Sequence, residues 1–298
     1  MHRLARLDAP GVLHHIIVRG IERRKIFRDN KDRDNFIDRL SDLLPATQTA
    51  CYTWAFIPNH AHFLFRSSGE ISTLMRKLLT EYAIHFNRRH KRHGQLFQNR
   101  YKSIICQEDM YFRELIRYIH LNPLRAKIVS NIKELNKYPY SGHSVLMGIK
   151  KHEWQDTEYV FSYFGKKVSE SRKSYLSYVK KGIDQGRRPE LTGGGLVRNL
   201  GGWSMIKKLR LKGQDRIKGD ERILGDGEFV TALLSEAKEK FERGYKLKGL
   251  GYDLKKISQM VSKIYDIEIE EISNFRSFNR ARTLHGFRIY QGRRFSLL

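Results

Sequence analysis

The fold is decided by one continuous stretch, Cys51-Tyr52-Thr53-Trp54-Ala55-Phe56-Ile57-Pro58-Asn59-His60-Ala61-His62-Phe63-Leu64-Phe65. Both of its ends are rich in aromatic and aliphatic residues, which favour strands, and Pro58-Asn59 between them is typical of a turn. Two strands joined by so short a connection pair in antiparallel fashion. The stretch therefore predicts a β-hairpin over residues 51–65.

Strand and helix patterns alternate around this hairpin. Before it, residues 12–18 are apolar and partly β-branched, which indicates a strand, and apolar residues at helical spacing indicate a helix over 32–44. After it, we expect a helix over 71–90, a strand over 97–106 and a helix from 108 to about 122. This order is typical of a ferredoxin-like α+β fold. We expect an antiparallel sheet with helices on one face.

The 298-residue chain is strongly basic. It carries 57 Lys and Arg against 32 Asp and Glu, a formal net charge of +25. Both halves contribute, because residues 1–150 hold 26 basic and 13 acidic side chains and residues 151–298 hold 31 and 19. Such a charge implies a polyanionic partner that contacts both halves. The 40% of hydrophobic residues can build real cores, which excludes a disordered polyelectrolyte.

The sequence also excludes two classes of protein. No apolar run approaches the roughly 18 residues of a membrane helix, and Met1-His2-Arg3 is not followed by the apolar core of a signal peptide. We therefore expect a cytoplasmic protein with no membrane partner. Cys51 and Cys106 are the only cysteines, which excludes a disulfide framework and a cysteine-based zinc site.

Two histidines lie one residue apart in the second strand of the predicted hairpin. Because side chains alternate along a strand, His60 and His62 project to the same side of the sheet. One metal ion could be held by both imidazoles. Two histidines near a turn can also be ordinary surface groups, but the apolar residues on either side predict a central strand pair, where polar side chains need partners.

A second polar pair lies on the helix that begins near Asp109. Tyr118 and Asn122 are four residues apart and so are neighbours on one helical face. Two imidazole nitrogens and one amide oxygen, with coordination positions left open, suit Mg²⁺ or Mn²⁺ better than a closed structural zinc site. A buried ring with a hydrogen-bonded hydroxyl is the alternative interpretation of Tyr118.

Together these segments resemble a known family. Pro58-Asn59-His60-Ala61-His62-Phe63-Leu64 is followed by Arg117-Tyr118-Ile119-His120-Leu121-Asn122-Pro123-Leu124-Arg125-Ala126, and residues 14–20 and 94–103 look like further family segments. This ordered set, spread over residues 1–145, resembles the single-tyrosine HUH transposases of the IS200-like family. Within that family it is most similar to the relatives associated with repetitive extragenic palindromes. Ala61 and Ile21-Glu22 depart from the usual residues without touching the chemistry directly.

The resemblance implies roles for the site residues. His60, His62 and Asn122 would hold a divalent cation, Mg²⁺ or Mn²⁺, and Tyr118 would be the nucleophile that attacks a phosphodiester. The products would be a 5′-phosphotyrosine and a free 3′-hydroxyl, and a second strand could be rejoined without a nucleotide cofactor. His120 is a rival ligand, but on a helix it points away from Tyr118 and Asn122.

The resemblance also implies a DNA substrate that is single-stranded or a hairpin. Bases of such DNA can stack on aromatic and arginine side chains. In the first half, the arginines expected to contact DNA are Arg19, Arg88, Arg89 and Arg100. The cluster that contains Arg88 and Arg89 could equally be a solvated helix end.

The sequence divides into three parts. We expect a catalytic domain over 1–145, a basic, glycine-containing connector of unassigned role over 146–227, and a helical domain over 228–298. Residues 255–282 resemble the helix-turn-helix in the C-terminal duplex-binding domain of the bacterial replication initiator. Three arginines of this segment would then contact duplex DNA, namely Arg276, Arg280 and Arg282. A small helical bundle with a basic face is the alternative.

The favoured function is a metal-dependent DNA transposase, a strand transferase that cleaves and rejoins single-stranded or hairpin DNA. We expect a monomer or homodimer associated with the bacterial nucleoid. The alternatives are a non-catalytic, sequence-specific DNA-binding regulator derived from a transposase, and an HUH nicking initiator or relaxase. The intact set of His60, His62, Tyr118 and Asn122 favours the enzyme, and the single tyrosine argues against the initiator or relaxase.

Overall fold

The computed structural model describes residues 7–8, 10–69, 71–186, 188–192, 220, 222–236, 256, 258–260 and 262. The chain forms two compact units, Met1–Leu233 and Leu234–Leu298, and nearly all described residues belong to the first. The expected division into parts at residues 145 and 227 stays a prediction. The expected helix-turn-helix, with Arg276, Arg280 and Arg282, lies outside the described residues except for a few helical positions between 256 and 262.

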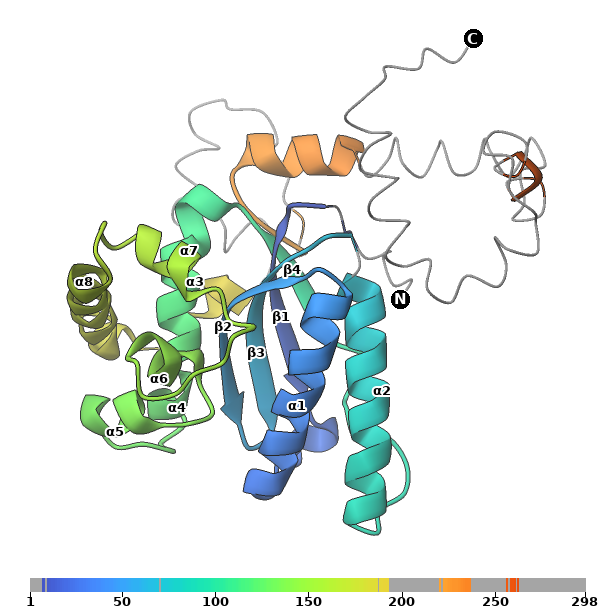
Figure 1. Ribbon diagram of the computed structural model, residues 1–298, viewed down its shortest axis with the longest axis horizontal. Helices are drawn as coiled ribbons and strands as arrows, with labels where there is room; N and C mark the ends of the chain where they lie inside the picture. Colours follow the sequence, from blue (N-terminus) through green and yellow to red (C-terminus); the bar gives the residue numbers. More distant parts are fainter. Residues whose placement is uncertain are drawn as a thin grey trace, which may run out of the picture. The chain divides into compact units, whose positions relative to one another are not determined.

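The first seven principal elements follow the predicted order of strand, helix, strand, strand, helix, strand and helix (Figure 1). They are β1 (Leu13–Arg19), α1 (Asn30–Ala46), β2 (Ala50–Ile57), β3 (His60–Arg66), α2 (Ile71–Arg89), β4 (Lys102–Cys106) and α3 (Glu108–His120). The predicted hairpin is confirmed, because β2 and β3 pair in antiparallel fashion through the turn at 58–59. The fourth strand is shorter than expected, since Phe97 makes only an isolated bridge with Gly20.

Short helices and turns follow α3 and pack around it. They are α4 (Asn122–Arg125), α5 (Ile132–Lys137), α6 (Gly142–Leu146), α7 (Thr157–Ser162) and α8 (Val168–Lys180), with the 3₁₀ turns η2 (Ile183–Gln185) and η3 (Pro189–Thr192). Another 3₁₀ turn, η1 (Ile21–Arg23), lies earlier in the chain, between β1 and α1. Strand β5 (Ile223–Leu224) precedes a helical stretch over 227–236. No helix in the described part of the chain is long and apolar enough to cross a membrane.

The sheet has five strands in the order β2-β3-β1-β4-β5. The first four pair in antiparallel fashion, whereas β5 runs parallel to β4. The expectation of a purely antiparallel sheet was therefore wrong. Strand β5 has only two residues and lies more than a hundred residues after β4, so no local pattern in the sequence predicts it.

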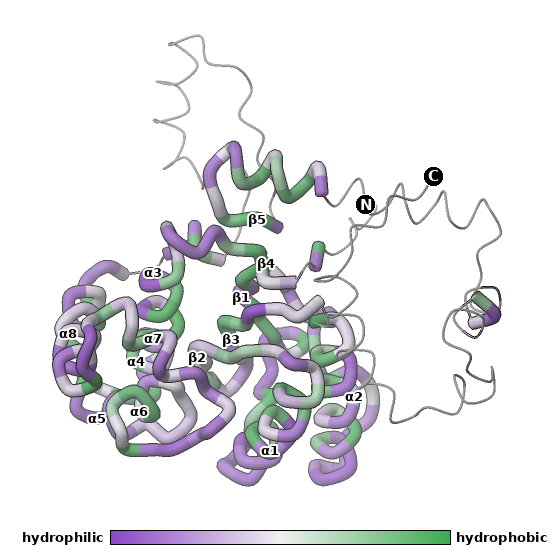
Figure 2. Tube along the Cα trace, turned by 45° about the horizontal axis from the view of Figure 1, so that its top comes forward, coloured by the Kyte–Doolittle hydropathy of each residue, from purple (hydrophilic) through white to green (hydrophobic). Residues whose placement is uncertain are grey.

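Helices cover both faces of this sheet, which corrects the expectation that they lie on one face (Figure 1). One core packs α1 and α2 against Trp54 and Phe56, and the other packs α3 to α8 against Ala55 and Ile57. The reason lies in the strands, which are almost continuously apolar, because a sheet buried on both faces needs apolar residues at every position. Figure 2 shows the hydrophobic colour along the strands and the hydrophilic colour on the outer turns of α1 and α2.

Strand register places three histidines on the α3 side of the sheet. In the pairing of β1 with β3, Arg19 lies opposite His60, Ile17 opposite His62 and His15 opposite Leu64. Because alternate residues share a face, His60 and His62 lie on one side, as predicted, and His15 lies on that same side. A β-bulge between Cys51 and Thr53 shifts the register of β2. This side of the sheet, near the β2–β3 turn, holds the candidate site.

Candidate functional site

Two histidines and the tyrosine singled out from the sequence surround one cavity of about 350 Å³. His60 and His62 come from β3 and Tyr118 from the last turn of α3. The walls also include an arginine and a lysine, and the lining residues are Ile17, Arg19, His60, His62, Gln98, Asn99, Tyr101, Lys102, Tyr118 and Thr192. Sequence reasoning therefore chose side chains that the fold does bring together.

The rings of these side chains lie close to one another. The ring centroids of His60 and His62 are 5.1 Å apart, and that of Tyr118 lies 5.8 Å from the His62 centroid in an edge-on arrangement. His62 is buried, whereas His60 and Tyr118 are half-buried at the cavity wall. Among the described residues, none forms a hydrogen bond with the Tyr118 hydroxyl.

A third histidine, His15 of β1, completes the cluster and was not predicted as a site residue. It is fully buried, and its Nε2 lies 2.9 Å from His62 Nδ1. Its Nδ1 lies 2.9 Å from the carbonyl oxygen of Leu191, a residue 176 positions later in the chain. The Tyr118 ring stands edge-on to it at 5.9 Å between centroids. Pairing of β1 with β3 would have revealed this position, but that pairing is not a local feature of the sequence.

The electrostatics of the cluster keep its imidazoles neutral. Burial lowers the pKa of His60 to about 4, with a smaller contribution from Arg19. Burial also lowers the pKa of His15 to about 4 and holds the pKa of His62 well below its usual value. A neutral imidazole has a lone pair that can bind a metal ion, whereas an imidazolium has none.

Burial also raises the pKa of the Tyr118 phenol above its ordinary value. Arg125 and Arg19 oppose this effect, because a nearby positive charge favours the phenolate. The Arg125 guanidinium carbon lies over the Tyr118 ring, 5.4 Å from its centroid, and its Nη1 donates to the Tyr118 carbonyl oxygen at 3.4 Å. At neutral pH the hydroxyl is therefore protonated, and a reaction through it requires further activation.

A buried chain of polar groups holds the end of α3 that carries Tyr118. His120 Nε2 bonds to the hydroxyl of Thr53 in β2, and His120 Nδ1 lies 2.7 Å from the hydroxyl of Tyr175 in α8. The same hydroxyl bonds to Nδ1 of His143, whose Nε2 lies 2.8 Å from Asn136 Oδ1. Both ring nitrogens of His120 are thus occupied, in agreement with the expectation that it points away from the site.

Asn122, the predicted third ligand, is buried at the start of α4. It is not among the residues that line the cavity, and its side-chain Nδ2 has no hydrogen-bond partner among the described residues. A buried amide without a partner is costly, and such a group is satisfied when a ligand or water reaches it. Its role as a ligand stays a prediction.

The segment 188–192 lies against the site, although the sequence suggested no role for it. Arg188 Nη1 lies 3.1 Å from Oε2 of Glu114, which precedes Tyr118 by one helical turn. Thr192 lines the cavity and the Leu191 carbonyl oxygen accepts from His15. Part of the expected connector therefore contributes to the wall of the candidate site.

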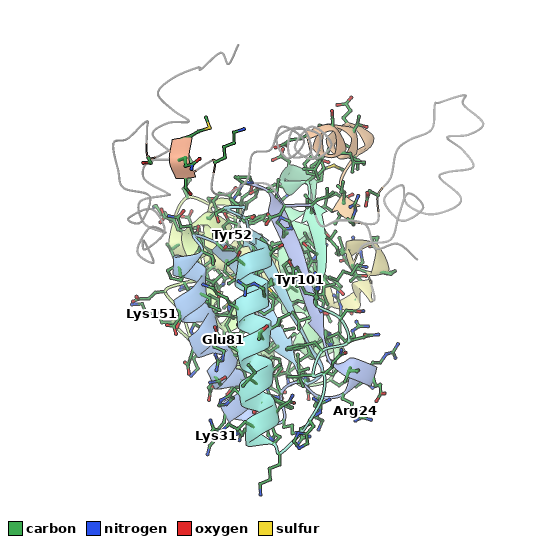
Figure 3. All side chains as sticks on the ribbon, turned by 90° about the vertical axis from the view of Figure 1, so that its right-hand side faces the viewer. Arg24, Lys31, Tyr52, Glu81, Tyr101 and Lys151 are labelled. Carbon is green, nitrogen blue, oxygen red and sulfur yellow. The ribbon has the colours of Figure 1, made fainter. Side chains whose placement is uncertain are left out.

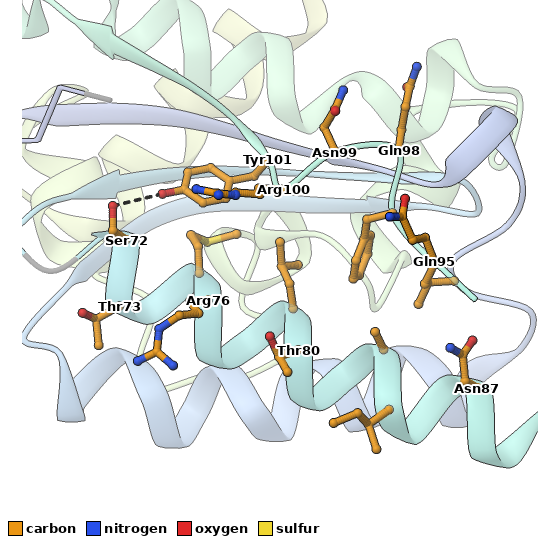
Figure 4. A pocket seen from close by; sticks show the side chains of 16 residues that line it. Ser72, Thr73, Arg76, Thr80, Asn87, Gln95, Gln98, Asn99, Arg100 and Tyr101 are labelled. Atoms are coloured by element: carbon orange, nitrogen blue, oxygen red, sulfur yellow. Dashed lines mark hydrogen bonds between the residues drawn. The ribbon is translucent and has the colours of Figure 1, made fainter. Parts of the chain in front are cut away.

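A longer groove of about 1020 Å³ adjoins this cavity and shares Gln98, Asn99 and Tyr101 with it. It runs between α2 and residues 95–101, and Figure 4 shows Arg76 and Thr80 on the helix with Arg100 and Tyr101 across from them. The Tyr101 hydroxyl lies 3.5 Å from Ser72 Oγ. Figure 3 shows Tyr101 beside α2. The groove thus combines aromatic, amide and basic side chains.

The four arginines expected to contact DNA differ in their surroundings. Arg19 lines the cavity, Arg88 is exposed at the end of α2, and Arg100 is exposed at the groove. Arg89 instead joins the end of α2 to the start of α1, because its guanidinium pairs with Asp29 at 2.6 Å and with Asp32. The geometry therefore gives Arg89 a structural partner, and DNA contact by the other three arginines stays a prediction.

The donor set of the cavity fits a divalent cation with open positions. In the described residues no three His, Cys, Asp or Glu side chains form a metal-binding group. Two neutral imidazoles from His60 and His62, with the amide oxygens of Gln98 and Asn99 in the same wall, match the ligands that divalent ions such as Mn²⁺ accept. A closed four-ligand zinc site is not present in this part of the chain.

Comparison with known proteins gives two findings. Residues 10–122 match the family described as IS200-like transposases. One similar solved structure is described as a REP-associated tyrosine transposase bound to a REP hairpin. It has a TM-score of 0.41 and 14% sequence identity, over 52% of this chain and 98% of that chain. No curated protein matches the chain.

Proposed function

We propose that this protein is a DNA strand transferase that cuts and rejoins single-stranded or hairpin DNA through Tyr118. The observation that carries the proposal is the meeting of His60, His62 and Tyr118 around one cavity, in the part of the chain that matches the IS200-like transposase family. The excess of basic side chains supports a DNA substrate. The expected regulator without catalytic activity would have no need of a phenol beside paired imidazoles.

The chemistry follows from the positions of these groups. The Tyr118 oxygen attacks the phosphorus of a phosphodiester, a new oxygen–phosphorus bond forms, and the bond to the 3′ oxygen breaks. The phenol proton leaves to solvent and the 3′ oxygen takes up a proton, which gives a 5′-phosphotyrosine and a 3′-hydroxyl. Attack by the 3′-hydroxyl of another strand reverses these steps and restores Tyr118. No nucleotide cofactor is needed, because the bond energy is retained.

Tyr118 needs help for this attack, because burial raises the pKa of its phenol. His60 and His62 would hold a divalent cation, Mg²⁺ or Mn²⁺, and Asn122 is the proposed third ligand. When bound, such a cation polarises the phosphodiester and offsets its charge. Arg125 and Arg19 favour the phenolate, and Arg19 also lies where it can contact the phosphate.

The groove beside the cavity is the proposed path of the DNA strand. Single-stranded DNA binds to basic grooves in which aromatic side chains stack with bases. Tyr101 and Phe97 supply aromatic surface, and Arg76 and Arg100 are exposed basic groups in the same groove. Because Tyr101 lines both the groove and the cavity, a DNA strand in the groove can present its phosphodiester to Tyr118.

The experiment that tests the proposal follows a covalent adduct. Wild-type protein is incubated with labelled single-stranded and hairpin oligonucleotides in Mn²⁺ or Mg²⁺, and a denaturing gel detects protein bound to DNA. Tyr118→Phe should abolish the adduct and leave DNA affinity unchanged, because only the phenol oxygen is removed. Tyr111→Phe on the same helix is the matched control and should retain the adduct.

Three outcomes would contradict the proposal. An adduct that survives in Tyr118→Phe would move the nucleophile to another residue. Tight DNA binding by the wild-type chain, with no adduct on any oligonucleotide or with either metal, would favour the non-catalytic regulator. An adduct that forms and is never rejoined to a second strand would favour the nicking initiator or relaxase.

Duplex DNA is the proposed partner of residues 228–298. The sequence resemblance of residues 255–282 to a helix-turn-helix supports this proposal, together with the basic charge of the second half. A chain that ends at Glu236 keeps the described helical stretch 227–236 and should lose most duplex affinity, with a flatter salt dependence. Its reaction with a short single strand should persist, and loss of that reaction with unchanged duplex affinity would reverse the assignment.

A further inference from the structure

A continuous line of hydrogen bonds runs from the segment 188–192 into the candidate metal site. The Leu191 carbonyl oxygen lies 2.9 Å from His15 Nδ1, and His15 Nε2 lies 2.9 Å from His62 Nδ1. The two imidazole rings are nearly stacked, with an interplanar angle of 27°. Neither ring nitrogen of His15 is left to bind a metal, so its function must be exerted through His62.

The direction of each bond in this line is fixed by chemistry. A carbonyl oxygen can only accept, so the proton of His15 must be on Nδ1. His15 is fully buried and pairs with no carboxylate in the described part of the chain, so its Nε2 has no proton and accepts. His62 Nδ1 must then be the donor of the second bond. The remaining nitrogen of His62, Nε2, is left with its lone pair.

His60 adopts the same tautomer as His62 through a hydrogen bond to a different partner. Its Nδ1 lies 2.7 Å from Oδ1 of Asn59, the residue before it in the chain. An amide oxygen accepts, so His60 Nδ1 carries the proton and its Nε2 also keeps a lone pair. Both histidines of β3 therefore present the same nitrogen to a ligand. For His60 the partner is local, whereas for His62 it comes from another strand and a distant segment.

We infer that His15 is a positioning residue, which receives its orientation from the Leu191 carbonyl and holds His62 in the Nδ1–H tautomer with Nε2 free for a divalent cation. This inference rests on the proposed function, because it assigns His62 to a metal ion. It goes beyond that function because it assigns roles to His15 and to the segment 188–192. Hydrogen bonds of this kind to a ligating imidazole fix its tautomer and ring orientation.

The anchoring of segment 188–192 supports the inference. The carbonyl of Leu191 can direct His15 only if the segment is held in place, and Arg188 holds it through Glu114 of α3. Leu191 itself is fully buried in the core on this side of the sheet. The same helix carries Tyr118, so one helix carries the nucleophile and anchors the segment that orients a proposed metal ligand.

The test reads the tautomer directly, without metal and without DNA. Full-length protein labelled with ¹⁵N-histidine is studied at pH 7 by long-range proton–nitrogen NMR correlation, and a His62→Gln variant assigns the signals. His62 should show a protonated Nδ1 and an unprotonated Nε2. In His15→Phe the signal of His62 should become a mixture of tautomers or shift to the Nε2–H form. A His62 that carries its proton on Nε2 in the wild-type protein would overturn the inference.

Metal affinity gives the second readout, with Mn²⁺ alone as the probe in calorimetry. His15→Phe should weaken Mn²⁺ binding by roughly 10–100-fold. His15→Gln should restore most of the affinity, because its amide keeps a donor for Leu191 and an acceptor for His62. His14→Gln is the matched control, since His14 is an equally buried neighbour that bonds to Ser103 on the other face of the sheet.

The outcomes separate this inference from the proposed function. Unchanged Mn²⁺ affinity in a folded His15→Phe variant would overturn the inference and leave the proposed reaction standing. Equal losses in His14→Gln and His15→Phe would also overturn it, because they would mean general damage to the strand. The expected tautomer in a wild-type protein that forms no DNA adduct would confirm the orientation by His15 and contradict the strand transferase.

Discussion

Removal of one hydroxyl, by Tyr175→Phe, should destabilise the protein more than its size suggests. The Tyr175 oxygen is fully buried and joins His120 to His143. Bond directions can be followed from Asn136, whose Oδ1 accepts from His143 Nε2. His143 Nδ1 must then accept from the Tyr175 hydroxyl, and the Tyr175 oxygen accepts from His120 Nδ1. A phenylalanine leaves one buried donor and one buried acceptor without partners.

The expected magnitude follows from these two groups. Each unsatisfied buried polar group costs about 1–3 kcal/mol, so the free energy of unfolding should fall by about 2–6 kcal/mol. The substitution should also affect function. His120 follows Tyr118 by two residues on α3, and its hydrogen bond to Tyr175 of α8 is lost. The rate of adduct formation should therefore fall in a variant that is still folded.

Urea denaturation followed by circular dichroism measures this change. The matched control is Tyr163→Phe, since that hydroxyl donates to Glu108 at 3.2 Å in a half-buried position. The control should lose only about 0.5–1.5 kcal/mol, because the Glu108 carboxylate keeps Arg66 and Tyr159 as partners. A Tyr175→Phe variant within about 0.5 kcal/mol of the wild type, or no less stable than the control, would refute the buried chain of bonds.

Three further predictions concern pH, metal and DNA. Burial lowers the pKa of His143 to about 3, below its unfolded value of about 6.5, so the unfolded chain binds more protons and stability falls as pH drops below 6.5. From pH 7 to pH 5 this group alone should remove about 2 kcal/mol, and an unchanged pH dependence in His143→Gln would contradict it. Asn122→Ala should weaken Mn²⁺ binding roughly 10–100-fold in calorimetry, and an unchanged Kd would exclude Asn122 as a ligand. Arg100→Ala should reduce the slope of log affinity against log salt for single-stranded DNA by about 0.7, whereas Arg39→Ala, paired with Glu81 at 2.8 Å, should leave it unchanged.

Much of the fold could be predicted because its signals are local. Short segments of sequence contain the signals for the hairpin around Pro58-Asn59 and for the helices α1 to α3. The same is true of the position of His60 and His62 on one face of their strand. The error about helices on one face came from the same strands. Trp54 to Ile57 are apolar at every position, which indicates a sheet covered on both faces, whereas the order of the elements by itself favours helices on one face.

Features that join distant segments could not be predicted. The contact of His15 with Leu191 spans 176 residues, and β5 joins β4 across more than a hundred residues. Such contacts depend on how the whole chain packs, and no periodicity or motif within one segment predicts them. Arg89 shows a different error. A basic cluster in the sequence suggested that Arg89 contacts DNA, but in the fold its guanidinium pairs with Asp29 and Asp32.

The most direct measurement identifies the residue that becomes linked to DNA. Wild-type protein is incubated with Mn²⁺ and a pool of single-stranded and hairpin oligonucleotides, digested with a protease, and analysed by tandem mass spectrometry. The account predicts one modified peptide, in which the phosphate of a 5′ nucleotide is attached to Tyr118, and its loss when His60 and His62 are both changed to alanine. A modified peptide centred on Tyr111 or Tyr101, or a Tyr118 adduct that forms equally well without those histidines, would contradict it.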